Sequence, residues 1–200
     1  MRTMPKMYPG YREEVRKKII AEASSIFLSK GYSATTMDEI AARLGVTKAA
    51  IYQYYDGKAD LFAAVAEFQR QQIAGFLDRC FTEPDFMRGA AIHFDMLIEF
   101  VGRSKEIYSE MSVIALRDKK VKTILQEDLK SDIEMVRQFI EKQKARGLIH
   151  SPVDSRTLAV ASDALINGLM YDVIIGMDPA EAKKVWLNVV DDLFRVHEAG

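Results

Sequence analysis

Apolar residues recur every three or four positions along most of this chain, the spacing that places them on one face of an α-helix. No stretch shows the strict apolar-polar alternation of a β-strand. Glycine, proline and capping residues divide the helical pattern into about nine segments. We expect helices near residues 11–30, 36–44, 47–54, 58–80, 84–101, 104–114 and 118–146, then between Asp154 and Gly176 and after Pro179. The sequence therefore predicts an all-α fold of about nine helices.

The segment 36–55 predicts two short helices joined by a tight turn. Thr36 can cap the first helix, and Glu39 three residues later completes the pattern of a capping box. Gly45 can adopt the left-handed backbone that a sharp corner requires, and Thr47 can cap the second helix. The apolar residues expected to hold the two helices together are Ile40, Ala41, Leu44, Val46 and Ile51. This layout is a helix-turn-helix, whose second helix enters the major groove of DNA.

The same region resembles the TetR-type (TetR/AcrR) transcriptional regulators over about residues 12–65. Many spacings agree at once, and Tyr54-Tyr55 stands where the family usually has His-Phe. The matching residues are Phe27, Lys30-Gly31-Tyr32, Thr35-Thr36-Met37, Ile40-Ala41, Leu44-Gly45-Val46-Thr47-Lys48, Ile51-Tyr52, Tyr54-Tyr55, Lys58 and Leu61-Phe62. The resemblance implies a three-helix DNA-binding head joined by a long fourth helix to a helical ligand-binding and dimerisation domain. It also implies a homodimeric repressor that releases its operator when a small molecule binds.

Polar side chains of the predicted recognition helix, Thr47 to Tyr54, are the candidates for reading DNA sequence. Lys48 can donate to guanine or to phosphate, and Gln53 can pair with adenine. A small residue such as Ala49 keeps the helix slim. The resemblance adds contacts to the DNA backbone. The complete set of candidate DNA-binding residues is Thr36, Thr47, Lys48, Ala49, Tyr52, Gln53, Tyr54 and Lys58. Alternatively, the tyrosines simply pack inside the head.

Charge supports a division into a basic head and an acidic body. Residues 1–58 hold 10 Lys and Arg against 6 Asp and Glu, so +4, whereas residues 59–200 hold 18 against 23, so −5. We expect a flexible arm at 1–10, a helix-turn-helix domain at 11–57, and a ligand-binding and dimerisation domain at 58–200. Arg2 and Lys6 of the arm could follow phosphates, but a plain disordered terminus is the favoured interpretation.

The last two predicted helices are the candidates for a dimer interface. Small residues on the first would allow close helix approach, and large apolar residues on the second would supply area. The candidate interface residues are Ala161, Leu165, Gly168, Trp186, Val190, Leu193 and Phe194. The resemblance implies that these helices form a four-helix bundle across a twofold axis. The alternative is that they pack only within their own subunit.

Soft and aromatic residues gather between residues 68 and 139, a composition that suits an adaptable apolar pocket. The candidate pocket residues are Phe68, Phe76, His93, Phe94, Met111, Met135, Asn167 and Tyr171. The expected effector is apolar or amphipathic, and the roughly 33 Å helix at 58–80 could transmit its binding to the head. The alternative is a filled core.

Other classes of protein receive little support. One cysteine and three separated histidines predict neither a disulfide nor a metal site, and no cofactor is expected. No phosphate-binding glycine loop or nucleophile elbow occurs, so the sequence does not predict an enzyme. We expect a cytoplasmic protein, because no apolar run of about 18 residues and no secretory signal is evident. The alternatives are a helical protein-interaction adaptor or an enzyme that uses the C-terminal cavity.

Overall fold

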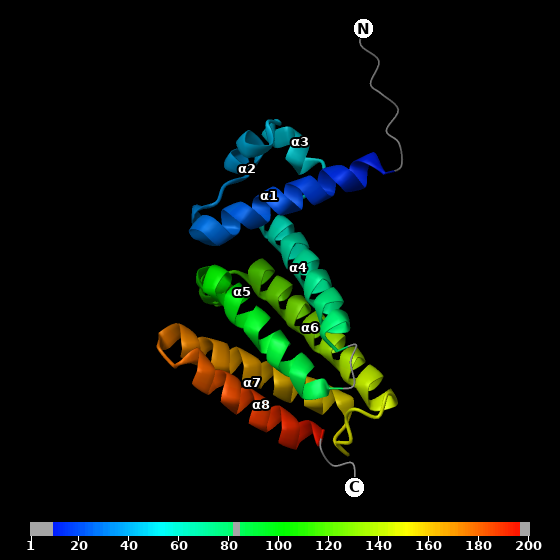
Figure 1. The fold of residues 1–200 in the computed structure, drawn as a ribbon. Helices are drawn as coiled ribbons and strands as arrows, with labels where there is room; N and C mark the ends of the chain where they lie inside the picture. Colours follow the sequence, from blue (N-terminus) through cyan, green and yellow to red (C-terminus); the bar gives the residue numbers. More distant parts are fainter. Residues whose placement is uncertain (1–9, 82–84, 197–200) are drawn as a thin grey trace. The chain divides into compact units, whose positions relative to one another are not determined.

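The computed structural model describes residues 10–81 and 85–196, and the elements within these ranges are helices without strands. The helices are α1 (Tyr11–Ala34), α2 (Met37–Leu44), α3 (Lys48–Tyr52), α4 (Lys58–Cys80), α5 (Phe86–Ala115), α6 (Lys119–Ala145), α7 (Ser155–Ile175) and α8 (Pro179–Phe194) (Figure 1). The predicted all-α fold is therefore confirmed. Arg2 and Lys6 of the predicted arm, and the predicted break at Glu83-Pro84, lie outside the described residues.

The structure interrupts α1 at the predicted end of the first helix, but another predicted break is absent. Gly31, with φ 81° and ψ 173°, interrupts α1, so the eight described helices contain nine helical segments. The predicted break near Ser104 is wrong, because α5 runs without interruption from Phe86 to Ala115. A single glycine such as Gly102 costs a helix only about 1 kcal/mol relative to alanine, which packing along 30 residues easily exceeds.

The helices form two compact units, each with its own core. The first unit comprises the chain up to Gln69 together with Glu106–Leu125, and the second comprises Arg70–Lys105 and Gln126 onward. The chain therefore changes unit within α4, α5 and α6, and not only at the predicted boundary between residues 57 and 58. The functional division at 57/58 remains a prediction.

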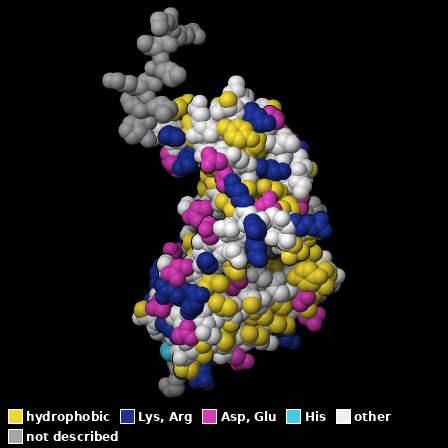
Figure 2. Space-filling model, turned by 180° about the vertical axis from the view of Figure 1, so that it is seen from behind, with side chains coloured by type: hydrophobic (Ala, Val, Ile, Leu, Met, Phe, Trp, Pro, Cys, Tyr) yellow, Lys and Arg dark blue, Asp and Glu magenta, His cyan; other side chains and the backbone are white. Residues whose placement is uncertain are grey.

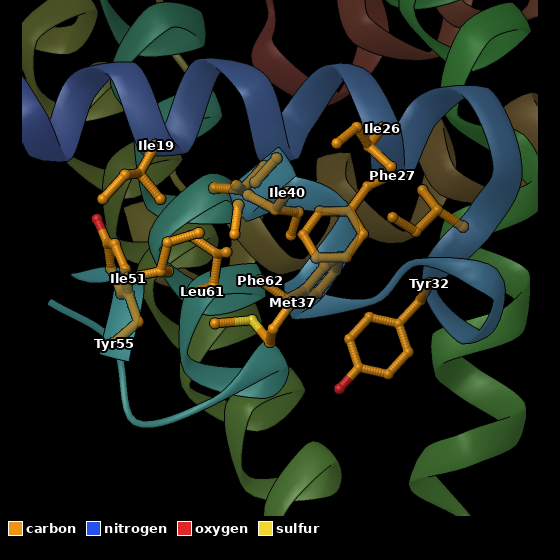
Figure 3. Packing of buried hydrophobic residues seen from close by; sticks show 14 of the residues in the cluster. Ile19, Ile26, Phe27, Tyr32, Met37, Ile40, Ile51, Tyr55, Leu61 and Phe62 are labelled. Atoms are coloured by element: carbon orange, nitrogen blue, oxygen red, sulfur yellow. The ribbon is translucent and has the colours of Figure 1, made fainter. Parts of the chain in front are cut away.

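The core of the first unit lies beneath α1, where α2, α3 and α4 converge (Figure 3). The ring of Phe27 stacks on Tyr32 at a centroid distance of 5.8 Å and meets the edge of Phe62 at the same distance. Ile40, Ile51 and other apolar residues fill the remaining space. The fully buried or nearly buried members include Ile19, Ala23, Ile26, Phe27, Ile40, Ala41, Ile51, Leu61, Phe62, Val65 and Met111. This core fixes α2 and α3 on α1.

The second unit is built on aromatic contacts and on the pairing of α7 with α8. Phe81 lies 4.9 Å from Phe86 and 4.7 Å from Phe139 between ring centroids. The buried indole N–H of Trp186 donates to the carbonyl of Ala90 at 3.1 Å, which attaches α8 to α5. Asp154 and Asp178 cap α7 and α8 through their carboxylates, as the sequence predicts for Asp154.

Helix α7 contradicts the expectation that the sequence contains no apolar run of about 18 residues. Its 18-residue window has a mean hydropathy of 1.5, so by length and composition α7 could cross a membrane. Only 28% of that window is buried within the subunit. Because α7 also packs against α8, its apolar character can equally serve contacts between helices.

Candidate DNA-binding surface and effector cavity

Local hydrogen bonds shape the helix-turn-helix as the sequence predicts. The hydroxyl oxygens of Thr36 and Thr47 accept from the backbone N–H groups of Glu39 and Ala50, each at 3.2 Å. Gly45 is left-handed, with φ 66° and ψ 29°, and ends α2. Of the two hydrogen bonds of a capping box, the described residues form the one that Thr36 accepts. The Glu39 carboxylate pairs instead with the ammonium of Lys30, at 2.5 Å.

Helix α3 is shorter than the predicted 47–54 and spans Lys48–Tyr52, with Gln53 as its C-cap. It turns Ile51 into the core, while its opposite side is exposed. The exposed candidates are Thr47, Lys48, Ala49, Tyr52 and Gln53 on or next to α3, and Thr36 at the start of α2. Val46 is 45% exposed, so the expectation that it packs between the helices is wrong. The N–H groups of Gly45 and Val46 both bond back to α2, which holds Val46 on the outside of the corner.

Arginines of α1 hold the end of α3, a role that the sequence pattern does not reveal. The guanidinium of Arg12 donates to the carbonyl of Gln53 at 3.3 Å and lies 5.6 Å from the centre of the Tyr54 ring. Arg16 lies 5.7 Å from the centre of the buried Tyr55 ring. Tyr54 is therefore half-buried beside α1, whereas Tyr52 projects outward.

Lys48 on the exposed side is paired within the molecule. Its ammonium lies 2.7 Å from the carboxylate of Asp38 on α2. The hydrogen bond that Lys48 donates to Asp38, together with the charge of that carboxylate, raises the pKa of Lys48 above the ordinary value. Both side chains are on the surface, so a pair of this kind contributes little stability. Lys48 can therefore exchange Asp38 for another anion at small cost.

Lys58, for which the resemblance implies a phosphate contact, is instead occupied by the head itself. Its ammonium donates to the carbonyls of Tyr32 at 2.8 Å, Ser33 at 3.3 Å and Thr35 at 2.8 Å. It also lies 4.4 Å from the centre of the Tyr32 ring. Three acceptors use all three donors of an ammonium group. Burial lowers the pKa of Lys58, and the charge of Glu110 opposes that shift.

Glu110 of α5 completes this arrangement from the other side. Its carboxylate accepts from the backbone N–H groups of Tyr32 at 2.6 Å and Ser33 at 2.8 Å. Burial acts to raise the pKa of Glu110, but hydrogen bonds from Ser33 and Tyr32 and the charge of Lys58 outweigh it and hold the pKa below its usual range. We call Lys58 and Glu110, with the 31–35 backbone they hold, the Lys58–Glu110 clamp. It fixes the segment that joins α1 to α2.

The second unit contains a cavity of about 70 Å³. Most of its lining is apolar or aromatic, and the polar exceptions are His93, Ser162 and Asp163. The lining residues are Leu77, Phe81, Phe86, Ala90, His93, Val136, Phe139, Ile140, Ser162, Asp163, Ile166, Trp186, Val190 and Phe194. Burial lowers the pKa of His93 to about 4, so this imidazole is neutral at pH 7.

The structure brings only one predicted pocket residue, His93, to this cavity. Met111 is fully buried in the core of the first unit, and Tyr171 is 61% exposed on α7. The remaining predicted residues, Phe68, Phe76, Phe94, Met135 and Asn167, lie on helices of the second unit or on α4 without lining the cavity. Asp163 lines the cavity but is not among the predicted pocket residues. The spacing of residues along one helix does not reveal which neighbouring helices a side chain faces.

The predicted dimer residues divide into two groups. Trp186, Val190 and Phe194 are buried within the subunit and line the cavity, so assigning them to a dimer surface is wrong. They lie on the inward side of α8. The helical spacing of apolar residues does not by itself distinguish a side that faces the core from one that faces a second subunit. Gly168 is exposed, and Ala161, Leu165 and Leu193 are half-buried.

The outward side of α7 and α8 carries a different set of apolar residues, which we call the α7/α8 face. Hydrophobic side chains are prominent on the lower part of the view in Figure 2. The exposed large apolar residues of the α7/α8 face are Val160, Tyr171, Ile174, Ile175, Val185 and Val189. Ala164 and Gly168 are exposed between them on α7. Small and large apolar residues on one unpartnered face are typical of an interface.

Comparison with known proteins agrees with this geometry. The HTH-type transcriptional activator FasR of Mycolicibacterium smegmatis is 43% identical over 56 residues, which are 28% of this chain and 26% of FasR. The HTH-type transcriptional regulator SrpR of Pseudomonas putida is 25% identical over 171 residues, 83% of this chain and 78% of SrpR. The chain thus aligns with only about a quarter of FasR but with most of SrpR.

The fold resembles that of a TetR-family transcriptional regulator from Rhodococcus sp., with a TM-score of 0.75 over 91% of this chain and 99% of the other. Because the two sequences are only 15% identical, this likeness concerns the fold alone. Residues 19–65, which contain the helix-turn-helix and the Lys58 end of α4, match the family described as bacterial regulatory proteins of the tetR family. The helix-turn-helix domain of this chain is therefore of the tetR type, as the match over residues 19–65 shows.

Proposed function

We propose that this protein is a cytoplasmic, homodimeric regulator of transcription that binds a near-palindromic operator through α3. In its simplest form it is a repressor that an apolar or amphipathic small molecule releases. The observation that carries the proposal is the exposed side of α3, which presents Lys48, Tyr52 and Gln53 while Ile51 anchors the helix in the core. A slim polar helix held this way suits the major groove.

The α7/α8 face supports the homodimer. A single head reads only a few base pairs, and two heads related by a twofold axis read an inverted repeat with half-sites about 34–36 Å apart or multiples of that distance. The exposed Tyr171, Ile175 and Val189 supply apolar area, and Gly168 allows close approach of α7 to a second copy. The interface proposed here uses this outward side and leaves Trp186 in the core.

The cavity supports control by a small molecule. Its residues come from α4 through α8, so a ligand that enlarges it would change the packing of these helices. A ligand shifts DNA binding only by its differential affinity for two conformations, typically about 1–3 kcal/mol. Repression is the simplest output, but FasR, which is 43% identical to this chain over 56 residues, is named as an activator.

The deciding experiment is selection of binding sites from a random duplex DNA library by the full-length protein at near-physiological salt. We expect enrichment of one inverted repeat. The double variant K48A/Q53A should relax base preference within each half-site, while Lys130→Ala, which removes an exposed lysine from α6, should leave the enriched sequence unchanged. No enrichment at this salt, together with no binding at low salt, would refute the proposal and favour the adaptor or enzyme class.

The direction of control requires a second measurement. Transcription from a promoter that carries the enriched site should fall when the protein is added and recover when an effector is present. A rise in transcription on adding the protein would identify an activator and refute the repressor part alone.

A further inference from the structure

The cavity of the second unit has one ionisable group that can carry charge at neutral pH. Among its described lining residues, Asp163 is the only carboxylate, and neither lysine nor arginine is present. Burial holds His93 in its neutral form, as described above. The charge that the cavity can offer to a ligand is therefore negative.

Asp163 lacks a cationic partner in the described part of the chain. Its interaction within the protein is a hydrogen bond with Asn167, one turn further along α7. The nearby Asp132 carboxylate, by contrast, accepts a hydrogen bond from Arg70 at 2.6 Å. Burial, and then the charge of Asp132, raise the pKa of Asp163 above its usual range, because nothing cationic stabilises the ionised form.

The rest of the wall suits a cation that carries hydrocarbon. Phe81, Phe86, Phe139, Trp186 and Phe194 all line the same space. Aromatic faces attract cations electrostatically and also bury apolar surface. An anion would meet Asp163 without any compensating charge, and a neutral alcohol would leave the carboxylate without an ion pair.

The volume limits the size of the ligand. A cavity of about 150 Å³ holds benzene, so the present cavity of about 70 Å³ accepts a group of about six non-hydrogen atoms only when nearby side chains shift. Val136 and Ile166 line the cavity and are only half-buried, so they have room to move. A compact branched alkyl group fits such a space better than a large ring system.

We propose that the effector of this cavity is a small lipophilic amine, bound as its ammonium cation with the charge at Asp163 and the hydrocarbon against the aromatic wall. This inference rests on the proposed control by a small molecule and names the chemical class of that molecule. It also explains why an acidic residue borders an otherwise apolar space.

The test uses three probes with the same branched alkyl group, namely isopentylamine, 3-methyl-1-butanol and 4-methylpentanoate. Binding to the full-length protein is measured at pH 7 by calorimetry and by the shift in Tm, without DNA. We expect the amine to bind at least tenfold more tightly than the alcohol and the acid to bind most weakly. Equal binding of amine and alcohol, or preference for the acid, would overturn the proposal.

Two variants separate charge from packing. Asp163→Asn should reduce amine affinity to that of the alcohol and leave the alcohol unchanged. Asp95→Asn removes an exposed carboxylate of α5 that pairs with Lys183 at 2.7 Å, and it should change neither. Should Asp163→Asn not fold, Ser162→Leu, which fills the cavity, must abolish binding of both probes. Undiminished amine binding to either cavity variant would overturn the proposal.

The effect of each ligand on the affinity for the selected operator is measured in a separate assay. If the amine binds through Asp163 but leaves the affinity for the selected operator unchanged, the ligand class stands and the proposed effector control fails. If another compound releases the operator while Asp163→Asn has no effect on that release, the control stands and the amine proposal fails.

Discussion

Replacing Glu110 by glutamine tests whether the Lys58–Glu110 clamp holds the head together. The substitution keeps the size of the side chain but turns one carboxylate oxygen into an NH₂ group. Because both oxygens accept backbone N–H groups, at 2.6 and 2.8 Å, one donor of Tyr32 or Ser33 must then face another donor. The neighbouring ammonium of Lys58 also loses its negative partner.

The expected cost follows from these contacts. A hydrogen bond to a charged group contributes about 1.5–3 kcal/mol and a neutral one about 1 kcal/mol. Losing one charged bond and weakening the other would cost about 2–4 kcal/mol, but Glu110 is only half-buried and water can replace part of the interaction. We therefore expect Glu110→Gln to lower the free energy of unfolding by about 1–3 kcal/mol.

The assay is chemical unfolding at fixed protein concentration, repeated between pH 7 and pH 3.5. Because the pKa of Glu110 is lowered in the folded protein, the stabilisation is present above the unfolded pKa of about 4.3 and is lost as pH falls through the folded value. The difference between wild type and Glu110→Gln should thus be constant at neutral pH and shrink below about pH 4.

The matched control is Glu127→Gln, which makes the same chemical change at an exposed position of α6. We expect it to shift stability by less than about 0.5 kcal/mol. If both variants unfold alike at pH 7, or if the deficit of Glu110→Gln is unchanged at pH 3.5, the clamp does not stabilise the head as argued.

Three other substitutions test other parts of the structure. Lys58→Met should lower the free energy of unfolding by about 2–4 kcal/mol without changing the salt dependence of DNA binding, whereas a lost phosphate contact would reduce the slope of log K against log salt by about 0.9. Trp186→Phe should cost about 1–3 kcal/mol, measured by urea unfolding, because the buried Ala90 carbonyl loses its donor; an unchanged midpoint would contradict this. Tyr171→Glu should weaken the dimer at least about tenfold in analytical ultracentrifugation, since a charge would enter the α7/α8 face; the control Val113→Glu, at another exposed apolar site, should not.

Local signals in the sequence predicted the helix-turn-helix well. Thr36, Gly45 and Thr47 act on their own backbone within three or four residues, so the caps and the left-handed turn could be placed without knowledge of the rest of the chain. The same holds for Asp154 at the start of α7. The missing break in α5 shows the limit, because continuity there depends on packing along the whole helix.

Contacts between distant segments could not be predicted in this way. The three acceptors of Lys58 lie 23 to 26 residues earlier in the chain, and the donors to Glu110 lie 77 and 78 residues before it. The inward position of Trp186 likewise depends on a carbonyl 96 residues away. Periodicity identifies the apolar side of a helix but not the partner that covers it. The cavity, bounded by five helices, is a property of that packing and of no single segment.

The pair between Lys48 and Asp38 has a consequence for how the protein would search a genome. Asp38 acts as a tethered counterion, so a phosphate that approaches Lys48 must displace it. An encounter with random DNA would therefore exchange one ion pair for another and gain little, which shortens the residence time at each non-target site. At the correct sequence the base contacts of neighbouring side chains would add to that exchange. An acidic residue beside the recognition helix would in this way favour rapid scanning over tight but indiscriminate binding.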